Sequence, residues 1–102
     1  MTSDSLAADV ARVAAALAGD ERAYMAIVEE HQPMVARLMW RFTRDPLKLE
    51  ELVHETFVQT YLSLARYKGT GPLGGWIRTI GVRAGYRHWR EKLKEKDREV
   101  LN

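Results

Sequence analysis

Apolar residues recur in this chain at steps of three and four positions, the period of an α-helix that buries one face. The first stripe consists of Leu6, Val10, Val13 and Leu17. Gly19 follows where a helix commonly ends, because glycine adopts the left-handed conformation of a C-terminal cap without strain. The pattern therefore predicts a first helix from about Ser5 to Ala18.

A second stripe begins after Asp20, whose carboxylate is suited to accept the free N–H groups of a helix start. A helix as far as His31 is predicted by the apolar residues Ala23, Tyr24, Ile27 and Val28. Pro33 suits a first helical turn or a kink, so we expect it to restart or bend the helix. The period then continues to about Thr43 through Val35, Leu38, Met39 and Phe42.

A longer helix is expected from Asp45 and Pro46, which suit the cap and the first helical position, to about Arg66. Its core-facing stripe is Leu49, Leu52, Val53, Phe57, Thr60 and Leu64. The segment from Tyr67 to Gly75 holds four glycines and one proline, and we predict that it is a loop.

A last helix is predicted to open at Trp76, to run past Trp89 and to fray in the charged tail. No strand pattern or internal repeat occurs. The 102 residues are the length of one domain, expected to span 1–102. We therefore predict an all-α fold, a compact bundle of four to five helices.

Composition excludes several classes of protein. The chain has no cysteine, so disulfide frameworks and thiolate metal sites are excluded. No apolar run approaches the roughly 20 residues of a membrane helix, and the first four residues lack the basic flank of a secretion signal. The chain is expected to be cytoplasmic, without membrane contact.

Charge is divided unevenly along the chain. The first 66 residues hold seven Lys and Arg against ten Asp and Glu, and the remaining 36 hold nine against four. Such a basic C-terminal part indicates contact with nucleic acid or an acidic surface, or else a solvated, lysine-rich terminal helix. Charge alone leaves both alternatives open.

The sequence offers no catalytic constellation. His54-Glu55 resembles the opening of a zinc-protease helix, but Val58 stands where the second histidine is needed. Gly69, Gly71 and Gly74 have the spacing of a dinucleotide-binding loop, but a helix precedes them instead of the required strand. We therefore predict neither an enzyme nor a bound metal or cofactor.

Two helix faces carry chemistry outside the core stripes. Glu51, Glu55, Val58 and Leu62 share one side of the helix that starts at Pro46. Apolar residues framed by carboxylates predict a basic, apolar partner helix, unless another helix of the same domain covers this face.

On the last helix, about one third of the circumference carries Trp76, Thr79, Arg83, Arg87, Arg90 and Lys94. Next to Tyr67 and Lys68 of the glycine-rich loop, this stripe has the chemistry of a single-stranded nucleic-acid site. Arginines neutralise phosphates and aromatic rings stack on bases. The alternative is a solvated arginine face with Trp76 and Trp89 in the core.

These motifs resemble region 2 of the sigma-70 family, in the version of the extracytoplasmic-function group. The segments that carry the resemblance are Gly19–Tyr24, Arg44–Pro46, Glu51–Phe57, Tyr67–Gly71 and Trp76–Ile80 with Arg90. They occur in the family's order between about Val10 and Glu91.

The resemblance implies an RNA polymerase initiation factor that recognises the promoter minus-ten element as an opened nontemplate strand. One helix would dock on the clamp helices of the largest polymerase subunit. An anti-sigma factor is a further candidate partner. The implied polymerase contacts are Glu50, Glu51, His54, Glu55, Val58 and Leu62, and the implied DNA contacts are Tyr67, Lys68, Gly69, Thr70, Gly71, Trp76, Arg78, Thr79, Arg83, Arg87 and Arg90.

The chain departs from the family pattern at several positions. His54 stands for Gln, Leu73 for a common aromatic, and Gly81-Val82-Arg83 with Arg87 for a tract that holds polar readers. These last changes leave open an alternative function, a sigma-like protein-interaction module without promoter reading. The second, minus-thirty-five-reading domain of such factors is not expected within these 102 residues, so we expect an excised domain or a stand-alone relative.

Overall fold

The computed structural model describes residues 3–101 of the chain, with side chains for residues 5–100. It confirms the all-α prediction. The elements are α1 (Ser3–Leu17), α2 (Glu21–Met39), α3 (Pro46–Ser63), the short 3-10 helix η1 (Leu64–Arg66) and α4 (Leu73–Leu101). No strand and no helix long and apolar enough to cross a membrane occurs in the described part.

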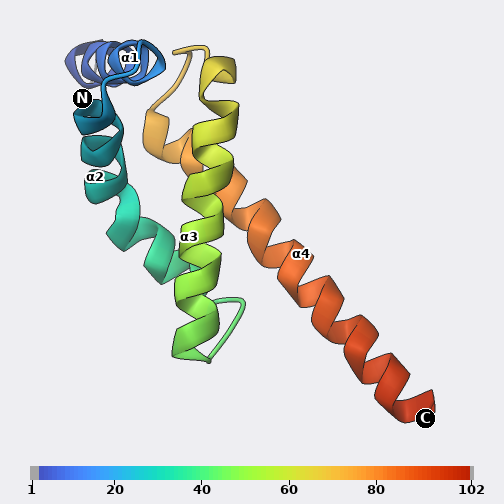
Figure 1. Ribbon diagram of the computed structural model, residues 1–102. Helices are drawn as coiled ribbons and strands as arrows, with labels where there is room; N and C mark the ends of the chain where they lie inside the picture. The colour runs from blue at the N-terminus through green and yellow to red at the C-terminus, as the bar shows by residue number, and fades with distance from the viewer. Residues whose placement is uncertain (1–2, 102) are drawn as a thin grey trace.

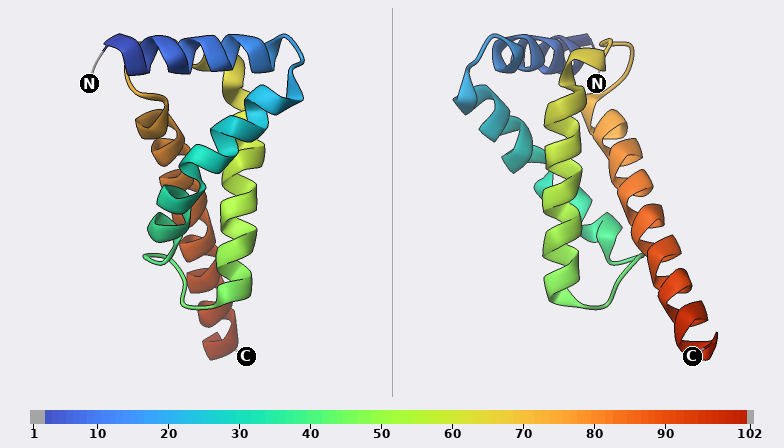
Figure 2. Two further views of the ribbon diagram at one scale, coloured as in Figure 1. Left: turned by 90° about the vertical axis from the view of Figure 1, so that its left-hand side faces the viewer. Right: turned by 45° about the vertical axis from the view of Figure 1, so that its right-hand side comes forward.

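Three helices form the body of the molecule, and α1 lies across one end of it (Figure 1). α2 packs against both α3 and α4, which also pack against each other. The loop before α4 lies at the same end as α1, and the C-terminal part of α4 projects away at the other end (Figure 2). The start of α4 is therefore surrounded by other elements, whereas its C-terminal part has no other described helix beside it.

The helix starts agree with the sequence. The Asp20 carboxylate accepts the N–H groups of Arg22 at 3.0 Å and Ala23 at 3.3 Å. Asp45 accepts the N–H of Leu47 at 3.0 Å. Pro33 lies inside one continuous helix, α2, which changes direction along its length (Figure 1). Its missing N–H removes one helical hydrogen bond, a common cause of a bend.

Two predicted helix ends were wrong. α2 ends at Met39, four residues before the expected Thr43, because the chain tightens into a turn in which Phe42 N–H bonds the Met39 carbonyl at 2.9 Å. The long helix ends at Ser63, and its expected last turn is 3-10 helix.

The predicted loop was also too long. α4 starts at Leu73, not at Trp76, so Gly74 and Gly75 are helical and the loop spans only residues 67–72. The early start of α4 is fixed by a residue outside the segment, because the Leu73 N–H donates to the carboxylate of Asp9 in α1 at 3.0 Å. The Trp76 N–H bonds the Pro72 carbonyl at 3.4 Å and closes the first turn.

The core confirms the predicted stripe of α3. Leu52, Val53, Phe57, Thr60 and Leu64 are buried, and Leu49 is half-buried. The hydroxyl of Thr60 donates to the Thr56 carbonyl at 2.8 Å, so this polar core group is satisfied.

Two glycines of α4 lie close to the end of α2 and to the turn that follows it. A Cβ at Gly81 would lie 3.0 Å from Leu38 Cδ2 and 3.2 Å from Met39 Cε, and one at Gly85 would overlap the ring of Phe42. The absence of side chains at these positions lets the two helices pack in direct contact.

Gly85→Ala should therefore destabilise the fold. The added methyl group must displace Phe42, and overpacking of this kind costs about 1–3 kcal/mol, more than the higher helix propensity of alanine returns. Urea unfolding followed by circular dichroism measures the difference. Gly75→Ala is the matched control, because nothing lies within 4 Å of its Cβ and helix propensity alone should stabilise it by about 0.5–1 kcal/mol. Equal stability of the two variants would contradict this packing.

His88 is a buried titratable group of α4. The residue is only 8% exposed, and its Nε2 has no hydrogen-bond partner among the described residues. Burial lowers the pKa of His88, and the positive charges of Lys48 and Lys92 lower it further, against the opposing effect of Glu91 and Glu95. The folded state therefore favours the neutral imidazole.

The free energy of unfolding should consequently decrease as the pH is lowered. Below the ordinary histidine pKa the unfolded chain binds a proton that the folded chain resists, so the free energy of unfolding decreases as pH drops through about 6.5. In denaturation between pH 7.5 and 5.5, His88→Gln should show a smaller decrease than the wild type. An unchanged slope in His88→Gln would refute the assignment.

Candidate functional site

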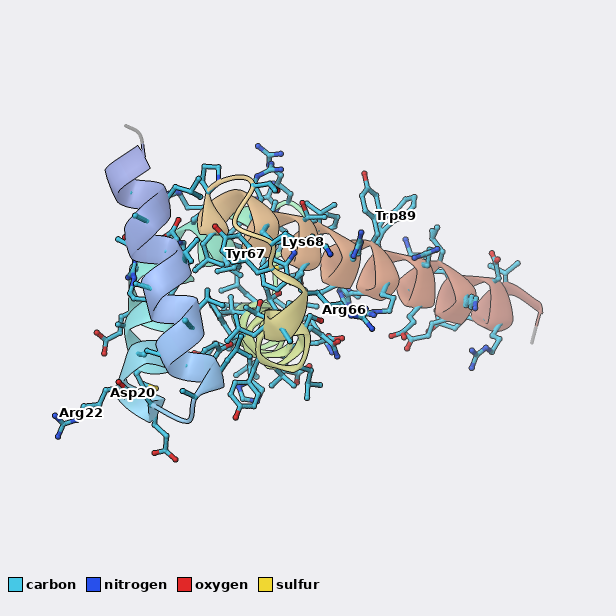
Figure 3. All side chains as sticks on the ribbon, turned by 90° about the horizontal axis from the view of Figure 1, so that it is seen from above. Asp20, Arg22, Arg66, Tyr67, Lys68 and Trp89 are labelled. Carbon is cyan, nitrogen blue, oxygen red and sulfur yellow. The ribbon has the colours of Figure 1, made fainter. Side chains whose placement is uncertain are left out.

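The loop and the first turns of α4 enclose a pocket of about 390 Å³. Its lining, called here the loop pocket, consists of Arg66, Tyr67, Lys68, Thr70, Gly71, Pro72, Gly75, Trp76 and Thr79. Figure 3 shows Tyr67 and Lys68 on the loop between α1 and α4. The pocket brings together six predicted DNA contacts from two separate motifs. Two of its lining residues, Arg66 and Lys68, are positively charged, and none carries a carboxylate.

The shape of the loop pocket depends on Tyr67. Its hydroxyl donates to the Gly71 carbonyl at 2.6 Å and so ties the two sides of the loop together. Its ring lies 5.6 Å from that of Trp76, centroid to centroid, at an angle of 51°. Partial burial, and then the negative charge of Asp9, raise the pKa of Tyr67, so the phenol keeps its proton at neutral pH.

Gly69 is a predicted DNA contact that does not line the pocket. Its φ of +71° lies in the left-handed region, and it faces the side chain of Val10 in α1. Its position therefore indicates a role in shaping the loop.

The predicted arginine stripe lies exposed along α4. Arg83 and Arg90 form no ion pair with any carboxylate of the described residues. Arg87 pairs with Glu55 of α3 at 3.0 Å, and both side chains are about half-exposed. Two of these three arginines are thus free to bind phosphate, and the third is shared with the neighbouring helix.

The alternative that placed Trp76 and Trp89 in the core was wrong for Trp89, which is 49% exposed. Figure 3 shows Trp89 on the part of α4 that extends away from α1. Trp76 is half-buried, with part of its surface in the loop pocket.

A second groove was missed by the sequence interpretation. It holds about 570 Å³ between the end of α2 and the middle of α4, and its lining is Leu38, Arg41, Phe42, Arg78, Val82, Tyr86 and Trp89. Arg78, a predicted DNA contact, lies here and not in the loop pocket. Phe42 packs edge-on against Tyr86 at 5.3 Å. The signal available in sequence was the Arg41-Phe42 pair after α2, which we assigned to a continuing helix.

No described helix covers Val58 and Leu62 on the outer face of α3, so the alternative of an internal cover was wrong. Val58 is 40% exposed and Leu62 is 70% exposed. Leu47 and Tyr61, which the sequence interpretation left out, are exposed on the same helix. The predicted polymerase contacts therefore lie on an accessible, mixed acidic and apolar surface, called here the α3 face.

Within the α3 face, the acidic groups differ in their contacts. Glu51 pairs with Lys48 at 2.7 Å within its own helix. Glu50 and His54 line a groove that α3 forms with α2. Glu55 reaches Arg87 of α4, so this pair joins the α3 face to the arginine stripe. Among the described residues, no group of three or more His, Asp or Glu is placed to hold a metal ion.

A basic, aromatic-lined surface thus lies next to an acidic, apolar one on an all-α bundle. The sequence model described as Sigma-70 region 2 matches residues 27–95. The chain belongs to this family. The extracytoplasmic-function subgroup stays a prediction.

Comparison with curated proteins gives the RNA polymerase sigma-H factor of Pseudomonas aeruginosa, 26% identical over 70 residues. The match covers 69% of this chain and 36% of that protein, so the chain spans little more than a third of its relative. Comparison with solved structures gave no match.

Proposed function

We propose that this chain is the part of a transcription initiation factor that binds core RNA polymerase and holds the promoter minus-ten element as an opened strand. The observation that carries the proposal is the loop pocket, which lies next to arginines that lack carboxylate partners. α3 supplies the polymerase contact, and the loop with α4 supplies the DNA contact. No step of this function requires the chain to catalyse a reaction.

The loop pocket supports binding of an extruded base. Tyr67 and Trp76 offer aromatic surface for stacking, and the glycines of the loop leave backbone groups open to a base edge. A base inside a duplex cannot reach such a pocket, because its faces are stacked on its neighbours. The preferred ligand is therefore a single strand.

The arginine stripe supports a sequence-independent contact. Arg83 and Arg90 extend along α4 from the pocket and suit successive phosphates of a strand. Phosphate contacts fix the register of the strand and the pocket reads one of its bases.

The α3 face supports a docking contact with a protein. Exposed carboxylates framed by Val58 and Leu62 suit a helix that carries basic and apolar groups. The clamp helices of RNA polymerase, implied by the family resemblance, are such a partner in this proposal.

The alternative of a module that has lost promoter reading rested partly on Gly81. This residue is buried against Leu38 and Met39 of α2, where no side chain can face DNA. Its identity is explained by helix packing, so it does not argue for a loss of DNA recognition.

The proposed DNA contact predicts that substitutions in the arginine stripe and in the loop pocket change the affinity for DNA in different ways. Affinity selection from a random single-stranded library defines a preferred strand, and a shuffled copy is the control strand. Arg83→Ala should weaken both strands alike and reduce the slope of log K against log salt by about 0.7. Tyr67→Leu removes a stacking surface that any base can use and the bond to Gly71 that shapes the pocket, so it should weaken both strands, and the preferred strand more, by about 1–3 kcal/mol.

Fluorescence titrations of both strands at several salt concentrations separate the two effects. Arg87→Ala is a useful comparison with Arg83→Ala, since Arg87 first has to leave Glu55 and should therefore contribute less. If Arg83→Ala changed the ratio of the two affinities and Tyr67→Leu did not, the division between positioning helix and reading loop would be wrong.

The polymerase contact predicts that reversal of charge on α3 weakens docking. Glu50→Lys with Glu51→Lys should reduce affinity for bacterial core RNA polymerase by at least about tenfold, because the new charges face a basic partner. Neither residue contacts Arg87, so DNA affinity should stay unchanged. Glu95→Lys with Glu99→Lys on the exposed end of α4 makes the same change in net charge elsewhere. Equal binding of both double variants would exclude the α3 face as the docking surface.

A further inference from the structure

We propose that α1 positions the base-reading loop, and that Asp9 is the positioning residue through which it acts. This inference rests on the proposed function, because it assigns a cause to the shape of the loop pocket. Asp9 does not line the pocket and touches no candidate DNA contact with its carboxylate. Its effect on binding would be exerted through the backbone of the loop and of α4.

The carboxylate of Asp9 joins segments far apart in sequence. One oxygen accepts the N–H of Leu73, the first residue of α4, at 3.0 Å across 64 positions of the chain. The other lies 3.2 Å from the guanidinium of Arg12, which also pairs with Glu30 of α2. A buried negative charge at the free N–H groups of a helix start is favoured by both the hydrogen bond and the helix dipole. Asp9 therefore fixes where the loop ends and α4 begins.

A second contact of α1 holds the middle of the loop. The backbone of Gly69 lies so close to Val10 that a Cβ there would come within 2.9 Å of Val10 Cγ2. Its left-handed φ of +71° bends the loop at this point of contact. Asp9 and Val10 are adjacent in α1, so one turn of this helix supports both the bend and the end of the loop.

The burial of Asp9 argues against a role for it as a solvated surface charge. Its pairing with Arg12 and Leu73 compensates the loss of water, and removal of the carboxylate would leave the Leu73 N–H buried without a partner. The loop itself has one internal side-chain bond, from Tyr67 to Gly71. Without α1, the loop would keep that bond and lose the support of its bend and of its junction with α4.

α1 also lies outside the stretch that identifies the family, since the match begins at residue 27. Its sequence nevertheless includes two adjacent residues with specific partners in the loop. This helix therefore has a function of its own, beyond covering the end of the bundle.

The test compares Asp9→Ala with Asp20→Ala in the full chain. Both changes remove an aspartate that caps a helix start, but Asp20 follows the C-terminal end of α1, apart from the loop (Figure 3). Two readouts are needed: amide hydrogen exchange of Leu73 and the loop, and the ratio of affinities for the preferred and shuffled single strands. Circular dichroism verifies that each variant is helical.

Asp9→Ala should speed exchange at Leu73 at least about tenfold and lower the affinity ratio about tenfold, while the salt slope stays at the wild-type value. Asp20→Ala should leave both readouts unchanged. Asp9→Asn keeps an oxygen that can accept the Leu73 N–H, so it should recover part of both. If Asp9→Ala does not fold, Val10→Ala, which removes only the contact with Gly69, should shift the same readouts in the same direction by a smaller factor.

The two proposals fail differently. Unchanged exchange at Leu73 and the loop in Asp9→Ala would overturn the positioning role, whatever the DNA results. Faster exchange with an unchanged affinity ratio would also overturn it, because the loop would then read bases without α1. A wild-type chain that does not distinguish the two strands would refute the proposed reading of DNA, and the exchange data would still decide whether α1 holds the loop.

Discussion

At Gly81 and Gly85, α4 packs on the end of α2 and on Phe42 of the turn that follows it, with too little space for an added methyl group, and these contacts set the direction of the whole helix. Both parts of the candidate DNA surface depend on that direction. The loop pocket is built on the first turns of α4, and the arginine stripe lies on the opposite side of the same helix from the glycines. A rotation of α4 that relieved the contact would move the pocket and the stripe together. Under the proposed function, a rigid helix thus keeps the base-reading and phosphate-binding groups in one register.

The sequence predicted those features whose causes are local. The apolar stripes predicted the four α-helices and the core residues of α3. Asp20 and Asp45 predicted two helix starts, because a capping side chain bonds N–H groups within three residues of itself. The start of α4 could not be found in this way, because the group that fixes it is Asp9 of another helix. Six of the nine residues that line the loop pocket were identified by motif and resemblance, and Arg66, Pro72 and Gly75 were not. The second groove was missed because it combines the ends of elements that only the tertiary fold brings together.

The pair between Glu55 and Arg87 shows that the α3 face and the arginine stripe are not independent surfaces. Both side chains are about half-exposed, so the pair contributes at most about 1 kcal/mol and can exchange with other partners. A basic group that binds Glu55 releases Arg87 for a phosphate, and a phosphate that binds Arg87 releases Glu55. Under the proposed function, each ligand would remove a small cost from the binding of the other. This coupling needs no change in the backbone.

Arg83 and Arg87, two departures of this chain from the family pattern, are exposed positive groups on α4. Under the proposed function they would bind phosphates of any strand alike. Several side chains of the pocket lining carry hydrogen-bonding groups, among them Arg66, Lys68 and Thr70. The hydroxyls of Tyr67 and Thr79 already donate to the Gly71 and Gly75 carbonyls. Under the proposed function, selection of a base would combine these side chains with the shape of the pocket. Shape discriminates only if the loop is held in one conformation, which makes the contacts of Tyr67 with Gly71 and of α1 with the loop the structural basis of any selectivity.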